Sequence, residues 1–365
     1  MKVRYSYLRQ QFSNCPDLWI KLKKFVRTGD FTLGKPLKDF EKNFARLMKV
    51  KYAIGVNSGT DAIKLSLKVL GIRSGDEVIT AANTFVATVG AITELGAIPV
   101  FVDCDETFCI NTNLVEKKIT KKTKAIIPVH YTGYMTNMIK LKKIARKYKI
   151  PIVEDACQSI LASINDKISG SWGDLGAFSL HPLKNINVWS DGGIITTNKL
   201  KYYKELRLLR NHGLESRDKV KICGYNSRLD TFQAVVGNWL LPKAHRIANA
   251  RIKNARFYDK NFEKIKQITI PPRPKNFKIV YHLYIVFAKD RDNLLKYCHK
   301  KGIEAKIHYP IPIYRQRALE FLKHKKGDFP VTDFHAQNMI TFPCDQHISL
   351  NQMRYVISTV KKFYS

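Results

Sequence analysis

The sequence predicts an α/β protein in which a mostly parallel sheet is covered by helices on both faces and is followed by a smaller C-terminal α+β domain. Two observations support this prediction. Short apolar runs rich in β-branched residues alternate with amphipathic segments over the first two-thirds of the 365 residues, which is the strand-helix-strand order of a parallel sheet. The pattern changes after a long helical region, and the chain exceeds the usual length of one domain.

Seven apolar runs are predicted to be strands because they are short, mostly apolar and rich in Val, Ile and Thr. These runs are residues 52–56, 77–81, 98–103, 125–130, 150–155, 175–180 and 192–197. Three segments between them place apolar residues at three- and four-residue spacing, as amphipathic helices do. The predicted helices are residues 60–72, 84–96 and 138–150.

A long helical region is predicted over residues 224–265. It is followed by a strand (281–288), a helix (291–302), a strand (305–310) and a last helix (350–364). We therefore expect a large domain of residues 1–245, which includes the N-terminal segment, and a small C-terminal domain of residues 246–365.

The composition is that of an ordinary globular protein, with 45% hydrophobic and 25% charged residues. No stretch reaches the roughly 18 to 20 apolar residues that cross a bilayer, and the first residues lack the apolar centre of a signal peptide. We therefore expect a cytoplasmic protein without a membrane partner.

The net charge of +33 is the unusual value, and it leaves open a polyanionic partner such as nucleic acid. The lysines are spread along the whole chain, however, without a nucleic-acid-binding motif, so we expect a solvated basic surface and no nucleic-acid partner. The seven cysteines are scattered and never form a CxxC pair, which predicts neither a disulfide framework nor a metal site. They are interpreted as small buried hydrophobic residues.

A candidate phosphate site lies where residues 52–56 end and the next helix opens, at Gly59 and Thr60. A helix N-terminus presents free backbone N–H groups and the positive end of the helix dipole, and glycine permits close approach of the backbone. Ser, Thr and Asp are also ordinary helix caps, so this motif alone does not establish a phosphate site.

Asp155 ends a predicted buried strand, at the edge of a parallel sheet where ligands bind. A buried carboxylate there needs a partner, and the N–H of a pyridinium ring is one that it would keep protonated. Gln158 follows three residues later and could donate to the phenolic oxygen of such a ring. The alternative for Asp155 is a structural acid that caps the next turn.

Lys184 follows another predicted core strand, which ends near Ser179, and it lies between a proline and a glycine-rich turn. A loop lysine is ordinarily solvated. A lysine that is desolvated near a cationic ring has a lowered pKa, so it can form a Schiff base and move protons, and Ser179 could contact the same phosphate.

These motifs resemble those of the sugar aminotransferases named after DegT, DnrJ, EryC1 and StrS. The resemblance is collinear over nearly the whole chain and includes NSGTDAIKLSL, ANTFVAT, VEDACQS, GDLGAFSLHPLKN, SDGG, RNHG, GYNSRLD and GIEAKIHYP. It implies the aspartate-aminotransferase-like fold type I, with pyridoxal 5′-phosphate as cofactor and pyridoxamine 5′-phosphate as its intermediate form. It also implies a homodimer with shared active sites.

The resemblance further implies a role for each candidate residue. Gly59, Thr60 and Ser179 would hold the phosphate, and Phe85 would lie against the cofactor ring. Asp155 would pair with the ring nitrogen, and Gln158 would contact the phenolic oxygen. Lys184 would carry the cofactor. Asn226 would reach the cofactor phosphate in the neighbouring subunit's site, and His308 and Tyr309 would lie near the sugar-nucleotide substrate. Without the resemblance, we would interpret Phe85 as a core aromatic residue and His308 as a surface histidine.

The implied reaction transfers an amino group from L-glutamate to a keto sugar, with a nucleotide-linked 3- or 4-keto-deoxysugar as the expected acceptor, in amino-sugar biosynthesis of the surface-polysaccharide or lipopolysaccharide type. Two alternatives remain: a dehydratase of the same fold, in which histidine replaces the anchoring lysine, and a non-enzymatic regulatory protein.

Three residues depart from the common pattern of the family. Ile160 and Leu161 stand where many members have His-Gly, and Ser190 stands where many have Gly. We expect these changes to lie close to the site and to affect the choice of sugar.

Overall fold

The computed structural model describes all residues from 1 to 365. Its central sheet is built from two blocks of strands, β3-β2-β4 and β5-β8-β9-β1. Parallel bridges from Ile126 to Ile152 and from Val129 to Asp155 join β4 to β5. The strands are β1 (Tyr52–Val56), β2 (Glu77–Ala81), β3 (Ile98–Val102), β4 (Thr123–Ile127), β5 (Val153–Asp155), β8 (Leu175–Ser179) and β9 (Gly193–Thr197).

Only β9 runs against its neighbours, since it pairs antiparallel with both β1 and β8, whereas β2 pairs parallel with β3 and β4, and β5 with β8. The predicted mostly parallel sheet is therefore confirmed. Each of its seven strands overlaps one of the predicted runs. Several are shorter than predicted, and Pro128 to His130 lie beyond the end of β4.

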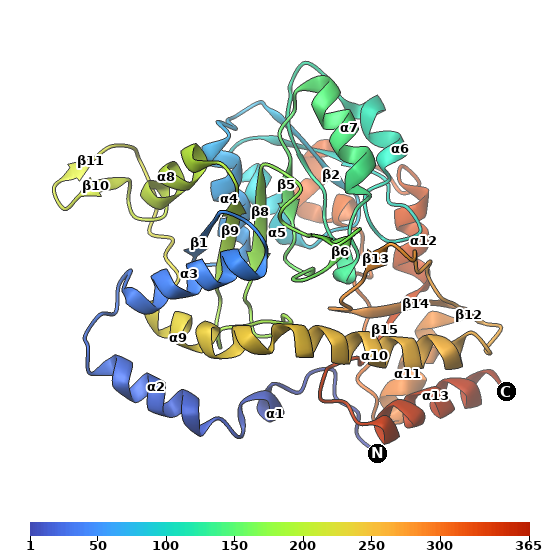
Figure 1. Cartoon of the computed structure of the whole chain (residues 1–365). Coiled ribbons are helices and arrows are strands. Elements are labelled where there is room, and N and C mark those ends of the chain that lie inside the picture. Colours follow the sequence, from blue (N-terminus) through green and yellow to red (C-terminus); the bar gives the residue numbers. More distant parts are fainter.

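Helices cover both faces of this sheet (Figure 1). Along β8 and β9, Phe178 and Ile194 face one hydrophobic core, while their neighbours Ala177 and Ile195 face another, as the two-residue period of a strand requires. The helices of this part are α1 (Leu8–Phe12), α2 (Pro16–Val26), α3 (Lys35–Leu47), α4 (Gly59–Val69), α5 (Val86–Thr93), α6 (Thr112–Val115), α7 (Met138–Tyr148) and α8 (Leu200–Leu209).

The C-terminal part packs a small antiparallel sheet against helices. The sheet has the order β12-β14-β15, formed by β12 (Ile268–Thr269), β14 (Tyr284–Ala288) and β15 (Met339–Phe342). The helices are α10 (Ala244–Phe262), α11 (Arg291–Lys300), α12 (Pro330–Asn338) and α13 (Leu350–Tyr364), and α13 has the bounds that were predicted. The predicted strand 305–310 is wrong: only Lys306 forms a bridge there, to Thr341 in β15.

The long helical region is divided by a proline. Helix α9 (Thr231–Leu240) ends in a 3₁₀ turn, η3 (Leu241–Lys243), which contains Pro242, and α10 follows directly, because proline cannot continue the hydrogen-bond ladder of a helix. Within α10, Ala248 belongs to the large hydrophobic core and Ala255 to the C-terminal core. The division at residues 245 and 246 stays a prediction.

The N-terminus packs against the C-terminal part. Val3 forms a parallel bridge with Ile303, and Val3 and Tyr7 belong to the C-terminal hydrophobic core. Figure 1 shows the N-terminus beside α13, and it shows the hairpin of β10 (Leu214–Ser216) and β11 (Lys219–Val220) protruding at the opposite side.

A small sheet of β6 (Ser163–Ile164), β7 (Lys167–Ile168) and β13 (Phe277–Lys278) joins segments from both halves of the chain.

No helix combines the length and apolar content needed to cross a membrane. All cysteines are free; five are buried and Cys157 is half-buried. Cys223 is exposed, which corrects the expectation that all of them are buried.

Candidate active site

The residues of the predicted phosphate site lie at the start of α4, shortly after the end of β1. Ser58 caps the helix, and its Oγ accepts a hydrogen bond from the N–H of Asp61 at 3.1 Å. The N–H groups of Gly59 and Thr60 lie in the same first turn, where a helix offers no internal acceptor. A Cβ on Gly59 would lie 2.8 Å from the Cβ of Ser179 and 3.0 Å from Cys157 Sγ. Glycine is therefore required here, and the structure brings Gly59, Thr60 and Ser179 together.

Asp155 lies at the carboxyl end of β5 and is 5% exposed. Its Oδ2 accepts a hydrogen bond from Thr88 Oγ1 at 2.7 Å, and its Oδ1 accepts one from the N–H of Cys157 at 3.2 Å. No Lys, Arg or His forms an ion pair with it. A buried carboxylate without a cation in the protein is costly, so the site suits a cationic ligand.

Lys184 is half-buried in the loop after β8, where its backbone N–H donates to the carbonyl of His181 at 2.8 Å. Desolvation lowers the pKa of its amine, while the neighbouring Cys157 and Asp155 act in the opposite direction. The structure thus brings the amine near the carboxylate of Asp155. A lysine with a lowered pKa is unprotonated more often, as a nucleophilic amine must be.

Gln158 is fixed by its amide oxygen. Its Oε1 accepts a hydrogen bond from the backbone N–H of Thr132 at 2.8 Å, and this bond assigns the orientation of the amide. The Nε2 group consequently remains as a donor, which agrees with the donor role expected from the sequence.

Aromatic side chains form another side of the site. Phe85 is 50% exposed, so it is not a core residue, and its ring centroid lies 5.9 Å from that of Tyr309. His308 Nδ1 lies 2.8 Å from Thr341 Oγ1, and its ring stacks on Tyr5 at 5.8 Å. His308 is half-buried, and burial lowers its pKa to about 4.

Asn226 is exposed, and the structure does not bring it into this group of residues. The next residue, Ser227, donates from its Oγ to Asp61 Oδ2 at 2.7 Å, which holds the segment against the first turn of α4. The role expected for Asn226 concerns a neighbouring subunit and stays a prediction.

The three departures from the family pattern differ in burial. Ile160 and Leu161 are 4% and 3% exposed and belong to the large hydrophobic core. Their side chains pack in the interior, and the expectation that these two changes affect the choice of sugar stays a prediction. Leu161 has a φ of 68°, the left-handed conformation that glycine adopts without strain. Ser190 is exposed.

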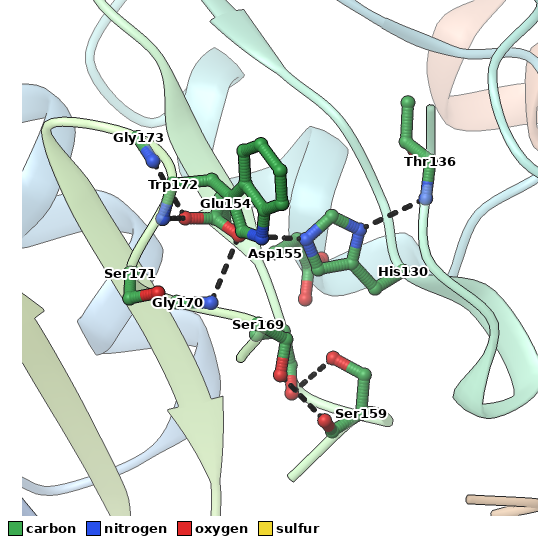
Figure 2. Close-up of polar contacts among 12 residues, drawn as sticks. His130, Thr136, Glu154, Asp155, Ser159, Ser169, Gly170, Ser171, Trp172 and Gly173 are labelled. Carbon is green, nitrogen blue, oxygen red and sulfur yellow. Dashed lines mark hydrogen bonds and ion pairs between the residues drawn. The ribbon is translucent and has the colours of Figure 1, made fainter. Parts of the chain in front are cut away.

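Sequence reasoning missed two residues beside Asp155. Thr88, on α5, makes the hydrogen bond to Asp155 described above, and Glu154 precedes Asp155 on β5 but faces the opposite side of the strand. Figure 2 shows Glu154 surrounded by the loop of residues 169–173 and by His130. The available indication in the sequence was a glutamate within the apolar run of residues 150–155, directly before Asp155.

A family model described as "DegT/DnrJ/EryC1/StrS aminotransferase family" matches residues 18–361. A pleiotropic regulatory protein of Geobacillus stearothermophilus is 35% identical and is covered over 99% of its length by 100% of this chain. A UDP-N-acetyl-3-dehydro-alpha-D-glucosamine 3-aminotransferase of Acidithiobacillus ferrooxidans is 34% identical, over 97% of this chain and 96% of its own.

Solved structures show the same fold. The crystal structure of S. venezuelae DesV in complex with a ketimine intermediate superposes with a TM-score of 0.97 at 31% identity, covering 100% of this chain and 99% of that one. The structure of NtdA from Bacillus subtilis with bound cofactor PMP gives a TM-score of 0.92 at 28% identity, covering 99% of this chain and 85% of that one.

Proposed function

The chain belongs to the DegT/DnrJ/EryC1/StrS aminotransferase family, and from this premise we propose that it transfers an amino group from L-glutamate to a nucleotide-linked keto sugar with pyridoxal 5′-phosphate as cofactor. The expected acceptor is a 3- or 4-keto-deoxysugar. The observation that carries the proposal is the buried carboxylate of Asp155, which forms no ion pair in the protein and lies near the Lys184 amine.

The residues of the site fit this cofactor. The free N–H groups of the first turn of α4 suit a phosphate, and Gly59 leaves the space that a Cβ would fill. The carboxylate of Asp155 suits the N–H of a pyridinium ring. The fold type and the cofactor-bound relative NtdA support the same assignment.

Each residue would then act in a defined way. When bound, the cofactor supplies a covalent carrier for the amino group and a ring that accepts electrons as a Cα proton leaves. Gly59, Thr60 and Ser179 would hold the phosphate, and Asp155 would keep the ring nitrogen protonated. The Nε2 group of Gln158 would donate to the phenolic oxygen, and Phe85 would cover one face of the ring.

Lys184 would anchor the cofactor and, once displaced by the amino donor, would carry the proton between the substrate carbon and the cofactor. The same amine would serve both half-reactions in opposite directions. L-Glutamate would leave as 2-oxoglutarate before the sugar enters, so we expect ping-pong kinetics. His308 and Tyr309 lie on the aromatic side of the site, where the sugar end of the substrate would bind.

A nucleotide-linked acceptor is favoured by the A. ferrooxidans relative, whose substrate is UDP-linked, and by the basic surface of the chain. The product would be an amino sugar for surface polysaccharide or lipopolysaccharide, made in the cytoplasm. The lysine at position 184 is evidence against the dehydratase alternative, in which histidine would replace it.

A homodimer is part of this proposal. Large apolar side chains are exposed together on α2 and next to it; Trp19, Ile20, Val26 and Phe31 are each more than half exposed. We call these four residues the α2 face. An exposed apolar patch of this kind is typical of an interface, and a second copy of this chain is the partner that the family resemblance implies.

The experiment that tests the function uses purified protein, pyridoxal phosphate and L-glutamate. Wild-type protein should bind the cofactor with visible absorbance and should release about one 2-oxoglutarate per chain with loss of that absorbance. Lys184→Ala should do neither, while Lys201→Ala, which changes an exposed lysine of α8, should behave as wild type. A wild-type protein that stays colourless with excess cofactor would refute the proposal.

A regulatory role is the second candidate, because one relative is named a pleiotropic regulatory protein. It would be supported by DNA binding that persists at physiological salt together with absence of cofactor absorbance. Binding that disappears at that salt is the ordinary behaviour of a basic surface.

A further inference from the structure

Glu154 is fully buried and accepts four hydrogen bonds (Figure 2). Its Oε1 accepts from the backbone N–H groups of Trp172 and Gly173, each at 2.7 Å. Its Oε2 accepts from the N–H of Gly170 at 2.8 Å and lies 2.9 Å from His130 Nε2. Each oxygen thus has two N–H partners, which is the arrangement that a carboxylate satisfies and an amide cannot.

The hydrogen bonds of His130 define which ring nitrogen carries the proton. Nδ1 accepts from the backbone N–H of Thr136 at 3.2 Å, so it presents a lone pair. Nε2 therefore carries the hydrogen and donates it to Glu154. Glu154 and His130 consequently tie the loop of residues 169–173 to the segment of residues 130–136.

The segment of residues 130–136 supplies the contacts that orient the candidate cofactor site. The N–H of Thr132 holds Oε1 of Gln158 at 2.8 Å, and the hydroxyl of Tyr131 donates to the carbonyl of His308 at 2.5 Å. The backbone of the same segment clamps the end of β5, because the N–H of His130 donates to the carbonyl of Asp155 at 2.9 Å.

The loop on the other side of Glu154 supports the turn that carries Gln158. Ser169 Oγ donates to the carbonyl of Ser159 at 2.6 Å (Figure 2). Gly170, at the centre of this loop, has a φ of 76°, and a Cβ there would lie 2.3 Å from the ring of Phe178. The loop is thus held in one conformation by close packing on β8 and by the carboxylate of Glu154.

We propose that Glu154 and His130 are positioning residues for the reaction: together they set Asp155 and Gln158 against the cofactor ring and hold the segment that fixes His308 at the substrate end. Neither residue would touch cofactor or substrate. The inference rests on the proposed function, since it gives Asp155, Gln158 and His308 the roles described there.

Glu154→Gln is the informative substitution because it keeps the size of the side chain. Glutamine offers one oxygen, so its NH₂ group would face two N–H donors, and either the loop 169–173 or His130 would have to move. Displacement of catalytic groups by about 1 Å can cost on the order of 100-fold in rate. A purely architectural role would instead lower the melting temperature and leave the bound cofactor unchanged.

The experiment compares Glu154→Gln with Glu41→Gln. Glu41 is also buried, at 8% exposed, and accepts from the N–H of Gly55 and from Arg210, but it makes no hydrogen bond to the segment 130–136 or to the turn after β5. The readouts are the dissociation constant of pyridoxal phosphate, the pH midpoint of its bound absorbance, kcat and KM. All are measured well below the melting temperature of each variant.

We expect Glu154→Gln to weaken cofactor binding about tenfold or more and to lower kcat by a similar factor, with a shift of roughly half a unit or more in the pH midpoint. Glu41→Gln should lower only the melting temperature. Equal cofactor affinity and an equal pH midpoint in wild type and Glu154→Gln would overturn the inference. Absence of cofactor absorbance in the wild type would refute the proposed function instead.

A second pair keeps the inference testable if Glu154→Gln fails to fold. In His130→Gln the amide Nε2 can still donate to Glu154, whereas in His130→Leu no donor remains. His130→Gln should retain cofactor affinity within a few-fold of wild type, and His130→Leu should lose about tenfold or more. Equal affinities in the two variants would contradict the proposed role.

Discussion

The carboxylate of Asp155 depends on a short chain of hydroxyl groups. Thr88 donates to Asp155 Oδ2 at 2.7 Å, and Thr84 Oγ1 lies 2.6 Å from Thr88 Oγ1. Because an ionised carboxylate only accepts, the proton of Thr88 points to Asp155, and Thr84 must donate to Thr88. One oxygen of Asp155 is thus held by α5 before any ligand binds.

Thr88→Val removes this donor without changing the shape of the side chain. A hydrogen bond to a charged group contributes about 1.5–3 kcal/mol, so we expect the unfolding free energy to fall by roughly that amount and cofactor affinity to fall with it. Denaturant titration and cofactor binding measure the two effects. Thr93→Val, in the same helix, removes only bonds to helix carbonyls and is the control; equal losses in both variants would show that Asp155 does not depend on Thr88.

His335 should make the protein sensitive to acid. It is 1% exposed, its Nδ1 has no hydrogen-bond partner, and burial lowers its pKa to about 4, while Asp103 acts in the opposite direction. At pH values between this folded-state pKa and the unfolded-state pKa of about 6.5, the unfolded chain binds more protons than the folded chain. The stability that depends on neutral His335 is therefore present above pH ~6.5 and is lost as the pH falls towards 4.

His335→Leu should therefore lose less stability than wild type over this window, by roughly 1–3 kcal/mol. Denaturant titrations at pH 7 and at pH ~4.5 give the difference directly. His245→Leu, at an exposed position of α10, should leave the acid sensitivity as in wild type. A wild-type protein and His335→Leu with parallel pH profiles would exclude His335 as the cause.

Some residues of the site could be indicated by the sequence alone, and others could not. Gly59, Asp155 and Lys184 lie in local motifs at the ends of strands, so a single sequence could indicate them. Thr88 and Tyr5 could not be found in this way, because their contacts to Asp155 and His308 depend on packing between segments far apart in the chain.

At the scale of elements, α13 shows that local interactions can determine where a helix begins and ends. Ser349 Oγ accepts from the N–H of Gln352 at 3.2 Å, and the Gln352 side chain accepts from the N–H of Ser349 at 2.9 Å. This capping box satisfies two otherwise free donors. The apolar spacing and the cap agree, so the helix begins and ends where the sequence predicts.

Ser349→Ala should cost about 1 kcal/mol, seen as a melting temperature lower by about 2 °C. Ser358→Ala, in the exposed middle of the same helix, should change the melting temperature little, because alanine is the better helix former there. If Ser358→Ala were the more damaging of the two, the cap would not be what stabilises α13.

The elements that the sequence did not indicate are held by distant partners. β15 has only four residues, and its strand character comes from pairing with β14 along its whole length. Residues 305–310 have a similar apolar pattern, but only Lys306 finds a strand neighbour. Whether a short run of this kind forms a strand or a loop depends on its neighbours in space. The spacing of apolar residues along the chain carries no information about those neighbours.

At the scale of the whole molecule, the α2 face predicts self-association. Trp19 is 58% exposed, and its ring centroid lies 5.5 Å from that of Trp189, in the loop that follows Lys184. A second copy of the chain covering this face would therefore lie close to the candidate site. This agrees with the shared active sites implied by the family resemblance.

Trp19→Arg should convert a dimer into a monomer, because it places a charge in the centre of an apolar interface. Sedimentation velocity at micromolar concentration measures the change, and an apparent dissociation constant weakened by about 100-fold or more is expected. Ile139→Arg, on the exposed side of α7, is the control. A wild-type monomer at these concentrations would contradict the dimer directly.

The placement of the N-terminus has a consequence for synthesis. The backbone N–H of Tyr5 donates to Glu304 Oε2, a residue 299 positions later, and Val3 pairs with Ile303. At about 5–20 residues per second, a ribosome needs roughly 15–60 s to deliver that partner. The first segment made is thus among the last to dock.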